Sequence, residues 1–255
     1  MIILKSPEEI KKMVPACLIV ARTLQYLGDE VRPGITTKEL EAMADAYIKE
    51  NSGIPAFKGY RGFPASICTS VNNEVIHGIP SRRQLREGDI IGIDIGVQKD
   101  GFYGDGARTF PVGRITPDAE KLLKVTESAL YQAIDKARPG NRVSDISHTI
   151  QEHVERNGFS VVRAFVGHGI GRDLHEDPQI PNFGPPNRGP RLRPGMTLAI
   201  ETMVNQGGYE VIILDDGWTT VTIDGKLSAH FEHTVLVTDY HAEILTLYNK
   251  KQYTV

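Results

Sequence analysis

One stretch, residues 90–110, constrains the fold of this chain more than any other. Two apolar runs flank Asp100-Gly101, a dipeptide typical of the tight turn in a β-hairpin. With this dipeptide as the loop, Gly96 faces Asp105 across the hairpin. Side chains alternate between the two faces of a strand, so Asp94 and Asp105 are predicted to be diagonal neighbours on one face.

The predicted hairpin has one polar face and one apolar face. Gly92 and Gly96 leave space around Asp94 and Asp105, while the opposite face is formed by Ile91, Ile93, Ile95 and Val97. Two carboxylates in one hollow repel and would not both ionise when bare, and a divalent cation removes that conflict. A surface hairpin with scattered acids is the simpler alternative, but Asp94 interrupts an isoleucine-rich run.

Length and composition narrow the class of protein. The 255 residues suffice for one large domain or two small ones, and the net charge of -3 does not indicate general nucleic-acid binding. The two cysteines, Cys17 and Cys68, fit a reducing compartment without a disulfide framework. No long apolar segment is visible, so the sequence predicts a cytoplasmic protein without a signal peptide or membrane span.

Two helices are predicted before the hairpin. Ser6 with Glu9 forms a capping box in front of a long apolar stripe that stops at the Arg-Pro-Gly of residues 32–34. Thr36 with Glu39 forms a second capping box, and this helix is expected to run to about residue 51. Both helices are predicted to have a structural role.

A second pair of helices suggests an internal repeat. One is predicted from residue 117 to the Arg-Pro-Gly of residues 138–140, and another from 143 to 157. The two Arg-Pro-Gly tripeptides are 106 residues apart, the Leu-Arg-x-Gly segments at 85–88 and 192–195 are 107 apart, and the offset of 107 places Asp94 on Glu201. A chance similarity is the alternative, but the agreement of the two offsets favours an internal repeat. The chain is then predicted to be a single domain, 1–255, with halves of about 1–110 and 111–255.

Further carboxylates interrupt apolar strands in the second half. A strand is expected over residues 161–166, leading into the glycine-flanked His168. Glu201 and Glu232 each stand within an apolar run, at residues 196–204 and 231–237. A charge inside such a run is costly unless it is paired or bound to a metal, and no evident set of buried lysines or arginines accompanies these acids.

These residues together predict a metal centre. Four carboxylates, from Asp94, Asp105, Glu201 and Glu232, would be balanced by two divalent ions, with His168 adding an imidazole. Oxygen-rich ligation with one imidazole suits Mn, Fe(II), Co or Zn. Two-metal sites activate a bridging water and polarise a carbonyl, which is hydrolase chemistry.

The other histidines lack a metal-binding spacing. His148 and His153 lie on a predicted helix, and His241 is expected on the surface. His230 and His233 flank the last carboxylate, where packing or a supporting role is a better prediction than ligation.

Taken in order, these motifs resemble methionine aminopeptidase in its short bacterial type I form. The similarity covers essentially the whole chain, and it is specific because all the motifs occur in order. The matching segments are 73–80, Asp94, Asp105, 167–171, His175, 200–204 and 231–235. The resemblance implies an α/β (α+β) pita-bread fold, in which two pseudo-symmetric halves share a curved antiparallel sheet covered by helices.

The resemblance also implies the role of each metal ligand. Asp94 would bind one ion, Asp105 and Glu232 would bridge both, and His168 and Glu201 would bind the other. Glu201 would also shuttle the proton of the water. The metals would be two divalent ions, of Co, Mn, Fe(II), Zn or Ni.

Substrate contacts follow from the same resemblance. His175 would hydrogen-bond the substrate carbonyl, and His77 would lie near the scissile amide nitrogen. A methionine pocket would be lined by Tyr60, Phe63, Cys68 and Trp218. The sequence departs from some relatives at Phe57, where cysteine is frequent, and at Leu174, where phenylalanine occurs, so the detailed shape of the pocket is open.

The implied activity is removal of the N-terminal methionine from nascent polypeptides when the second residue is small. The partners would be these polypeptides and, in transient contact, the ribosome. The enzyme would be a monomer that binds neither a membrane nor a specific nucleic-acid sequence. Prolidases and proline-specific aminopeptidases of this fold are one alternative, although they usually carry an added N-terminal domain. A non-catalytic pita-bread binding protein is another, but such proteins lose ligands. A soluble α/β protein of another role is the third.

Overall fold

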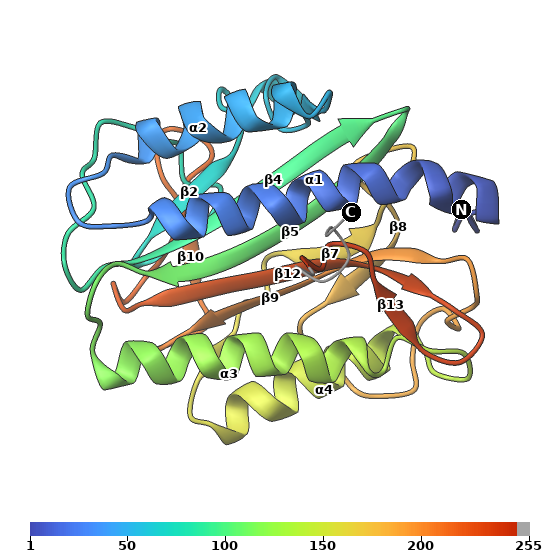
Figure 1. Cartoon of the computed structure of the whole chain (residues 1–255). Helices are drawn as coiled ribbons and strands as arrows, with labels where there is room; N and C mark the ends of the chain where they lie inside the picture. The colour runs from blue at the N-terminus through green and yellow to red at the C-terminus, as the bar shows by residue number, and fades with distance from the viewer. Residues whose placement is uncertain (249–255) are drawn as a thin grey trace.

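Four helices arranged in two pairs form one layer of the molecule in the computed structural model, which describes residues 1–248 (Figure 1). The pairs are α1 (Pro7–Glu30) with α2 (Thr37–Glu50), and α3 (Pro117–Ile134) with α4 (Val143–Arg156). Both predicted capping boxes are present: Ser6 accepts a hydrogen bond from the Glu9 backbone, and Thr36 accepts one from Glu39. No helix within residues 1–248 is long and apolar enough to cross a membrane.

The second layer is a 10-stranded sheet in which every pairing is antiparallel. Its main path runs β1-β4-β5-β12-β9-β7-β8, with β2 beside β4, β6 beside β9 and β13 beside β12. The strands are β1 (Ile54–Pro55), β2 (Cys68–Val71), β4 (Ile90–Lys99), β5 (Phe102–Pro111), β6 (Ser160–Val161), β7 (Val166–Gly169), β8 (Glu176–Pro181), β9 (Thr197–Asn205), β12 (Ser228–Val237) and β13 (Ala242–Ile244). A separate 3-stranded sheet has the order β10-β11-β3, from β3 (Glu74–Ile76), β10 (Val211–Ile213) and β11 (Thr220–Thr222).

The hairpin predicted from Asp100-Gly101 is confirmed as β4 and β5. Gly96 pairs with Asp105 as expected, and both loop residues have positive φ angles of 52° and 78°. The apolar face of β4 is fully buried against α1 and α2, with Ile91, Ile93, Ile95 and Val97 in one core cluster. The alternation along β4 therefore leaves Asp94 on the face that the helices do not cover.

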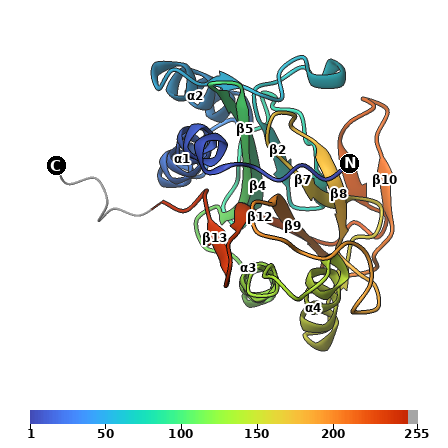
Figure 2. The same ribbon diagram turned by 90° about the vertical axis from the view of Figure 1, so that its right-hand side faces the viewer.

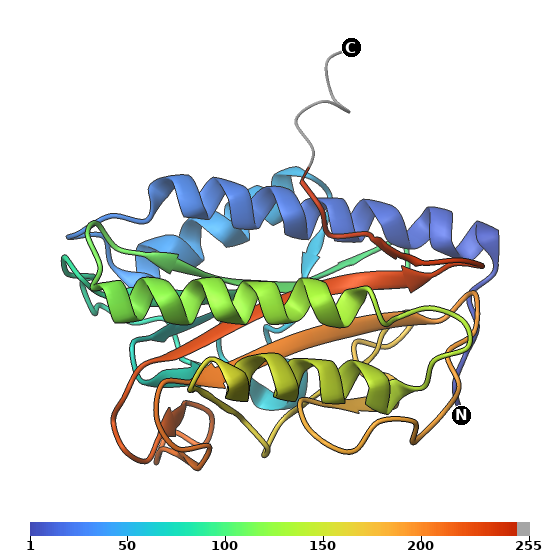
Figure 3. The same cartoon turned by 90° about the horizontal axis from the view of Figure 1, so that it is seen from below.

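The helices lie on one side of the large sheet. Figure 2 shows α1 and α3 on one side of the large sheet and the β10 hairpin on the other. Seen from below, α3 and α4 run beside each other along the sheet (Figure 3). The main core cluster of the second half joins α3 and α4 to β9 and β12, just as the first joins α1 and α2 to β4.

Two expected boundaries were wrong. The strand expected over residues 161–166 is split into β6 and β7. Each of these two strands pairs with β9, and residues 162–165 between them are not in a strand. Helix α3 ends at Ile134, ahead of the Arg-Pro-Gly at 138–140. The chain tightens there, since the amides of Lys136 and Ala137 bond carbonyls three residues back.

Candidate active site

A row of side chains crosses the open face of the large sheet. Asp94 on β4 pairs with Ala107 on β5, which also pairs with Glu232 on β12, and Glu232 pairs with Glu201 on β9. Directly paired residues point to the same face of a sheet, so the three carboxylates converge with only an alanine between them.

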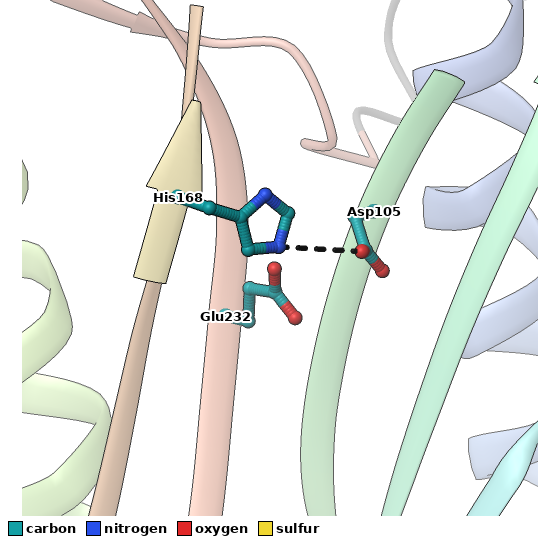
Figure 4. A group of neighbouring side chains, drawn as sticks. All are labelled: Asp105, His168 and Glu232. Atoms are coloured by element: carbon teal, nitrogen blue, oxygen red, sulfur yellow. Dashed lines mark ion pairs between the residues drawn. The ribbon is translucent and has the colours of Figure 1, made fainter. Parts of the chain in front are cut away.

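Asp105 and His168 join this row from neighbouring positions. Asp105 precedes Ala107 by two residues on β5, and His168 on β7 pairs with Ala199 of β9. One ligand atom from each of Asp105, His168 and Glu232 lies within 4.8 Å of the others (Figure 4). The Nε2 atom of His168 is 3.9 Å from Asp105 Oδ2 and 3.9 Å from Glu201 Oε1.

The glycines beside His168 allow this close approach. A Cβ atom on Gly169 would lie 2.1 Å from the Asp177 carbonyl oxygen, and one on Gly167 would lie 2.5 Å from that of Ala199. Both positions therefore require glycine for β7 to fit between β8 and β9. This tight packing fixes where the imidazole of His168 enters the site.

The convergence of four carboxyl groups makes each one harder to ionise. Burial raises the pKa of Asp94 to about 7. Burial, and then the charges of neighbouring carboxylates, raise the pKa values of Asp105, Glu201 and Glu232 well above their ordinary range. The predicted conflict between Asp94 and Asp105 is thus present and extends to the other two acids.

Histidines near the carboxylates are neutral. Burial, and then the charge of His175, lowers the pKa of His168 to about 3. The Nδ1–H of His168 donates to the Gly169 carbonyl oxygen at 2.9 Å, so Nε2 keeps its lone pair and faces the carboxylates. Burial, and then the charge of His77, also lowers the pKa of His230 to about 3, and its Nε2 lies 3.9 Å from Glu201.

These residues fit a divalent cation. The Oδ1 atom of Asp94 and the Oε1 atom of Glu232 are buried without a hydrogen-bond partner in the described part of the chain. Buried carboxylate oxygens without partners are costly, whereas four carboxylates and one neutral imidazole are the ligand types that divalent first-row metals prefer. We infer that this cluster is suited to binding metal.

All the predicted site residues line one cavity of about 140 Å³. The polar wall holds the carboxylates and histidines, and the apolar wall holds the predicted methionine contacts. The lining from the predictions is Tyr60, Phe63, Cys68, His77, Asp94, Asp105, His168, His175, Glu201, Trp218 and Glu232. Phe57 and Leu174 also line it, as do His230, Ile76 of the matching segment 73–80, and Arg61, which the sequence did not single out.

Aromatic rings build the apolar wall. The ring of Phe63 packs edge-on against Trp218, with centroids 5.1 Å apart, and Cys68 lies in the same cluster. A Cβ atom on Gly96 would lie 2.4 Å from the Phe57 ring, so the glycine admits this ring against the sheet. The hollow that glycines were expected to leave is therefore partly filled by Phe57.

Two histidines stand at the rim between the two walls. His77 follows β3 in a left-handed conformation, with φ of 59°, and its ring packs edge-on against Trp218 at 6.2 Å. His175 precedes β8, with its ring centroid 4.2 Å from that of His168. Burial, and then the charge of His175, lowers the pKa of His77 to about 4.

Four histidines, His148, His153, His233 and His241, lie outside the cavity. His153 bonds Gln132, and His233 bonds Thr246 on the helix-covered side of the sheet.

Arg61 belongs to a 3₁₀ turn, η1 (Tyr60–Gly62), in which it has φ of 48°. The only signal for its position was the pair of glycines that flank this turn in the sequence.

Known proteins of the same architecture were found by sequence and by structure. The model of metallopeptidase family M24 matches residues 11–239. Methionine aminopeptidase 1 of Bacillus subtilis is 57% identical over 96% of this chain and 99% of its own length. The corresponding protein of Clostridium perfringens is 58% identical over 97% of this chain and 99% of its own length.

Solved structures agree. The crystal structure of methionine aminopeptidase from Thermotoga maritima matches with a TM-score of 0.96 and 48% identity, covering 97% of this chain and all of that chain. Prolidase from Pyrococcus furiosus shares the fold, with a TM-score of 0.78, but at 22% identity and over only 66% of its length. The predicted pita-bread fold is confirmed, and the prolidase alternative is not favoured. The chain therefore belongs to metallopeptidase family M24 and, within it, to the methionine aminopeptidases.

Proposed function

We propose that this enzyme removes methionine from the N-terminus of polypeptides whose second residue is small. One observation carries this proposal: a single cavity joins a metal-binding carboxylate cluster to an aromatic-lined apolar wall. The cluster suits hydrolysis of a peptide bond, and the wall suits an unbranched apolar side chain. Relatives that share more than half of their residues with the chain are named for the same activity.

The carboxylate cluster is proposed to hold two divalent ions. Asp94 would bind one ion, His168 and Glu201 the other, and Asp105 and Glu232 would bridge both. Two doubly charged ions balance four carboxylates, which fits the raised pKa values of the bare site. Co, Mn, Fe(II), Zn and Ni all suit this mixture of oxygen and nitrogen ligands.

The protein groups then divide the work of hydrolysis. Divalent ions bound here would supply Lewis-acid activation of a water molecule and of the scissile carbonyl. Glu201 would accept the proton of that water and pass it on. His175 donates a hydrogen bond to the substrate carbonyl oxygen as negative charge develops on it. His77 would lie near the scissile amide nitrogen.

The apolar wall selects the first residue. Phe63 and Trp218 form an edge-to-face pair, and Tyr60 and Cys68 complete the lining for a methionine side chain. The rings of His77 and His175 line the same cavity, beside the predicted methionine contacts. Because nascent polypeptides are made on ribosomes, the enzyme would act in the cytoplasm and contact ribosomes transiently. We further propose that it acts as a monomer.

A peptide panel tests the activity. Purified protein stripped of metal is reconstituted with each of the five ions and assayed on Met-Ala-Ser, Met-Leu-Ser and Ala-Pro peptides. We expect release of methionine from Met-Ala-Ser only when metal is present, with Met-Leu-Ser cut far more slowly. Equal cutting of both methionine peptides would refute the specificity, and a preference for Ala-Pro would establish the proline-specific alternative. Metal without any hydrolysis would indicate a binding protein.

A further inference from the structure

Exposed apolar side chains gather on both faces of the hairpin formed by β10 and β11. Single exposed apolar side chains are common, but this group is concentrated within residues 209–223. The exposed fractions are 40% for Tyr209, 55% for Ile212, 54% for Ile213, 43% for Leu214 and 63% for Ile223. Such a concentration on one short hairpin indicates a binding surface.

These exposed apolar side chains flank a free strand edge. Strand β10 pairs with β11 on one side, and no strand within residues 1–248 pairs with its other side. The Leu214 amide bonds the Thr219 carbonyl, and the Ile223 amide bonds the carbonyl of Glu210. This alternation points the backbone groups of Val211 and Ile213 outward. A free apolar edge is a template for pairing with an extended peptide.

The same hairpin forms part of the wall of the catalytic cavity. Its turn carries Trp218, whose ring packs on Phe63 and His77. Strand β11 also pairs with β3, which ends at Ile76, directly before His77. Figure 2 shows the hairpin on the side of the large sheet away from α1. The turn of the hairpin thus borders the cavity through Trp218, and the free edge of β10 begins at that turn.

We propose that the edge of β10 binds the polypeptide substrate downstream of its small second residue, as an added extended strand. This inference rests on the proposed function, because a polypeptide with its first residue in the cavity has to leave across the rim. Each extended residue spans about 3.3 Å, so a few residues follow β10 over its whole length. The area that a three-residue strand edge can bury is far below the roughly 800 Å² that each partner buries in a stable dimer. A peptide is therefore a better occupant than a second copy of this chain.

Charge further defines the substrate. The hairpin and its flanks carry Glu210, Asp215, Asp216 and Asp224, with only Lys226 opposing them within residues 209–226. An acidic rim attracts basic side chains and repels acidic ones. Downstream residues that alternate apolar and basic side chains should therefore bind better than acidic sequences of the same length.

The test compares a short substrate with long ones. kcat/KM is measured on Met-Ala-Ser, on Met-Ala-Ser extended by alternating Val and Lys, and on the same length with Val and Glu. The wild type should prefer the Val-Lys peptide over the Val-Glu peptide by about tenfold. The wild type should also cleave the Val-Lys peptide faster than Met-Ala-Ser, and a triple variant, Ile212→Ser, Ile213→Ser and Ile223→Ser, should lose that advantage while cleaving Met-Ala-Ser within about twofold of wild type.

Two controls separate strand pairing from other effects. Ile3, 45% exposed near the N-terminus, provides the matched variant Ile3→Ser, which should keep that advantage. Long peptides N-methylated at alternate downstream amides cannot pair with β10, and they should lose the advantage without any change in the enzyme.

Several outcomes would overturn the proposal. Equal kcat/KM for the three peptides on wild type would do so, as would an advantage of the Val-Lys peptide over Met-Ala-Ser that survives both the triple variant and N-methylation. A dimer that dissociates in the triple variant would assign the edge to a second copy. Failure of the wild type to cleave even Met-Ala-Ser would instead reject the proposed function itself, so the two failures are distinguishable.

Discussion

The hydroxyl of Tyr60 lies 2.9 Å from Nδ1 of His175, and the two rings stack with centroids 5.3 Å apart. Tyr60 was predicted only as part of the methionine pocket. A tyrosine hydroxyl can donate to Nδ1, and the proton of the neutral imidazole then resides on Nε2. Burial, and then the positive charge of Arg61, lowers the pKa of His175, which keeps the ring neutral. The contact therefore bears on which nitrogen of His175 can donate to substrate.

Replacing Tyr60 by phenylalanine should lower kcat and leave KM nearly unchanged. The ring that lines the cavity remains, but the hydroxyl that orients the imidazole is lost, a change that typically costs about 10- to 100-fold. Steady-state kinetics on Met-Ala-Ser measure both constants, and ¹⁵N shifts of His175 report its tautomer. A Tyr60→Phe enzyme with wild-type kcat would leave Tyr60 as a wall of the pocket alone.

His175→Ala should reduce kcat by about 100- to 1,000-fold with little change in KM and with its metals retained. A donor to an oxygen that gains charge only in the transition state acts on the barrier rather than on substrate binding. Kinetics and metal content are measured on the same preparation. Loss of metal would make His175 a ligand, and a raised KM with normal kcat would restrict it to substrate binding.

Asp105→Ala should abolish metal binding and activity together. This side chain is 4% exposed and lies within ligand distance of both His168 and Glu232, so its loss removes a shared ligand. Metal analysis by mass spectrometry, next to a peptide assay, gives the result. Asp173→Ala, at an exposed position outside the cavity, is the matched control and should bind metal normally. An Asp105→Ala protein with two tightly bound ions contradicts the assignment.

Removing metal should destabilise the protein, and more so as the pH rises. Burial raises the pKa of Asp94 to about 7, so the bare folded site holds protons more tightly than the unfolded chain. Stability is then lost as the pH increases from the ordinary value near 4 through about 7. Metal binding to the folded state adds stability at high pH, where its ligands are ionised.

Melting temperatures measured from pH 5 to pH 8, with and without chelator, provide the comparison. The two curves should separate as the pH increases, and the chelated Asp94→Asn protein should show a flatter curve than the chelated wild type. Parallel curves for loaded and chelated wild type, with metal removal verified, would argue against a carboxylate-lined site.

Lys5 and Glu176 form a buried ion pair that supports the loop of His175. Their side chains are 1% and 4% exposed, and Glu176 also accepts hydrogen bonds from the amides of Arg172 and Asp173. Lys5→Met leaves the carboxylate without its partner and should cost about 3–5 kcal/mol of unfolding free energy. Denaturant unfolding measures this loss, and the double variant with Glu176→Leu should recover much of it. Additive losses would mean that the pair is not coupled.

Local sequence patterns determined the helices, the hairpin and the relation between its two aspartates. Asp100-Gly101 sets the turn, the turn sets the register, and alternation along β4 and β5 then puts Asp94 and Asp105 on one face. The capping boxes likewise placed the starts of α1 and α2, because a cap acts on backbone groups within one helical turn.

Only the tertiary structure decided how the two halves meet. Glu232 faces both Ala107 and Glu201 because β12 lies between β5 and β9, a neighbour relation between segments far apart in sequence. The resemblance named the ligands, but the sequence contained no local signal for this pairing. Strand order and loop packing arise from long-range burial and hydrogen bonding, which a local pattern does not encode.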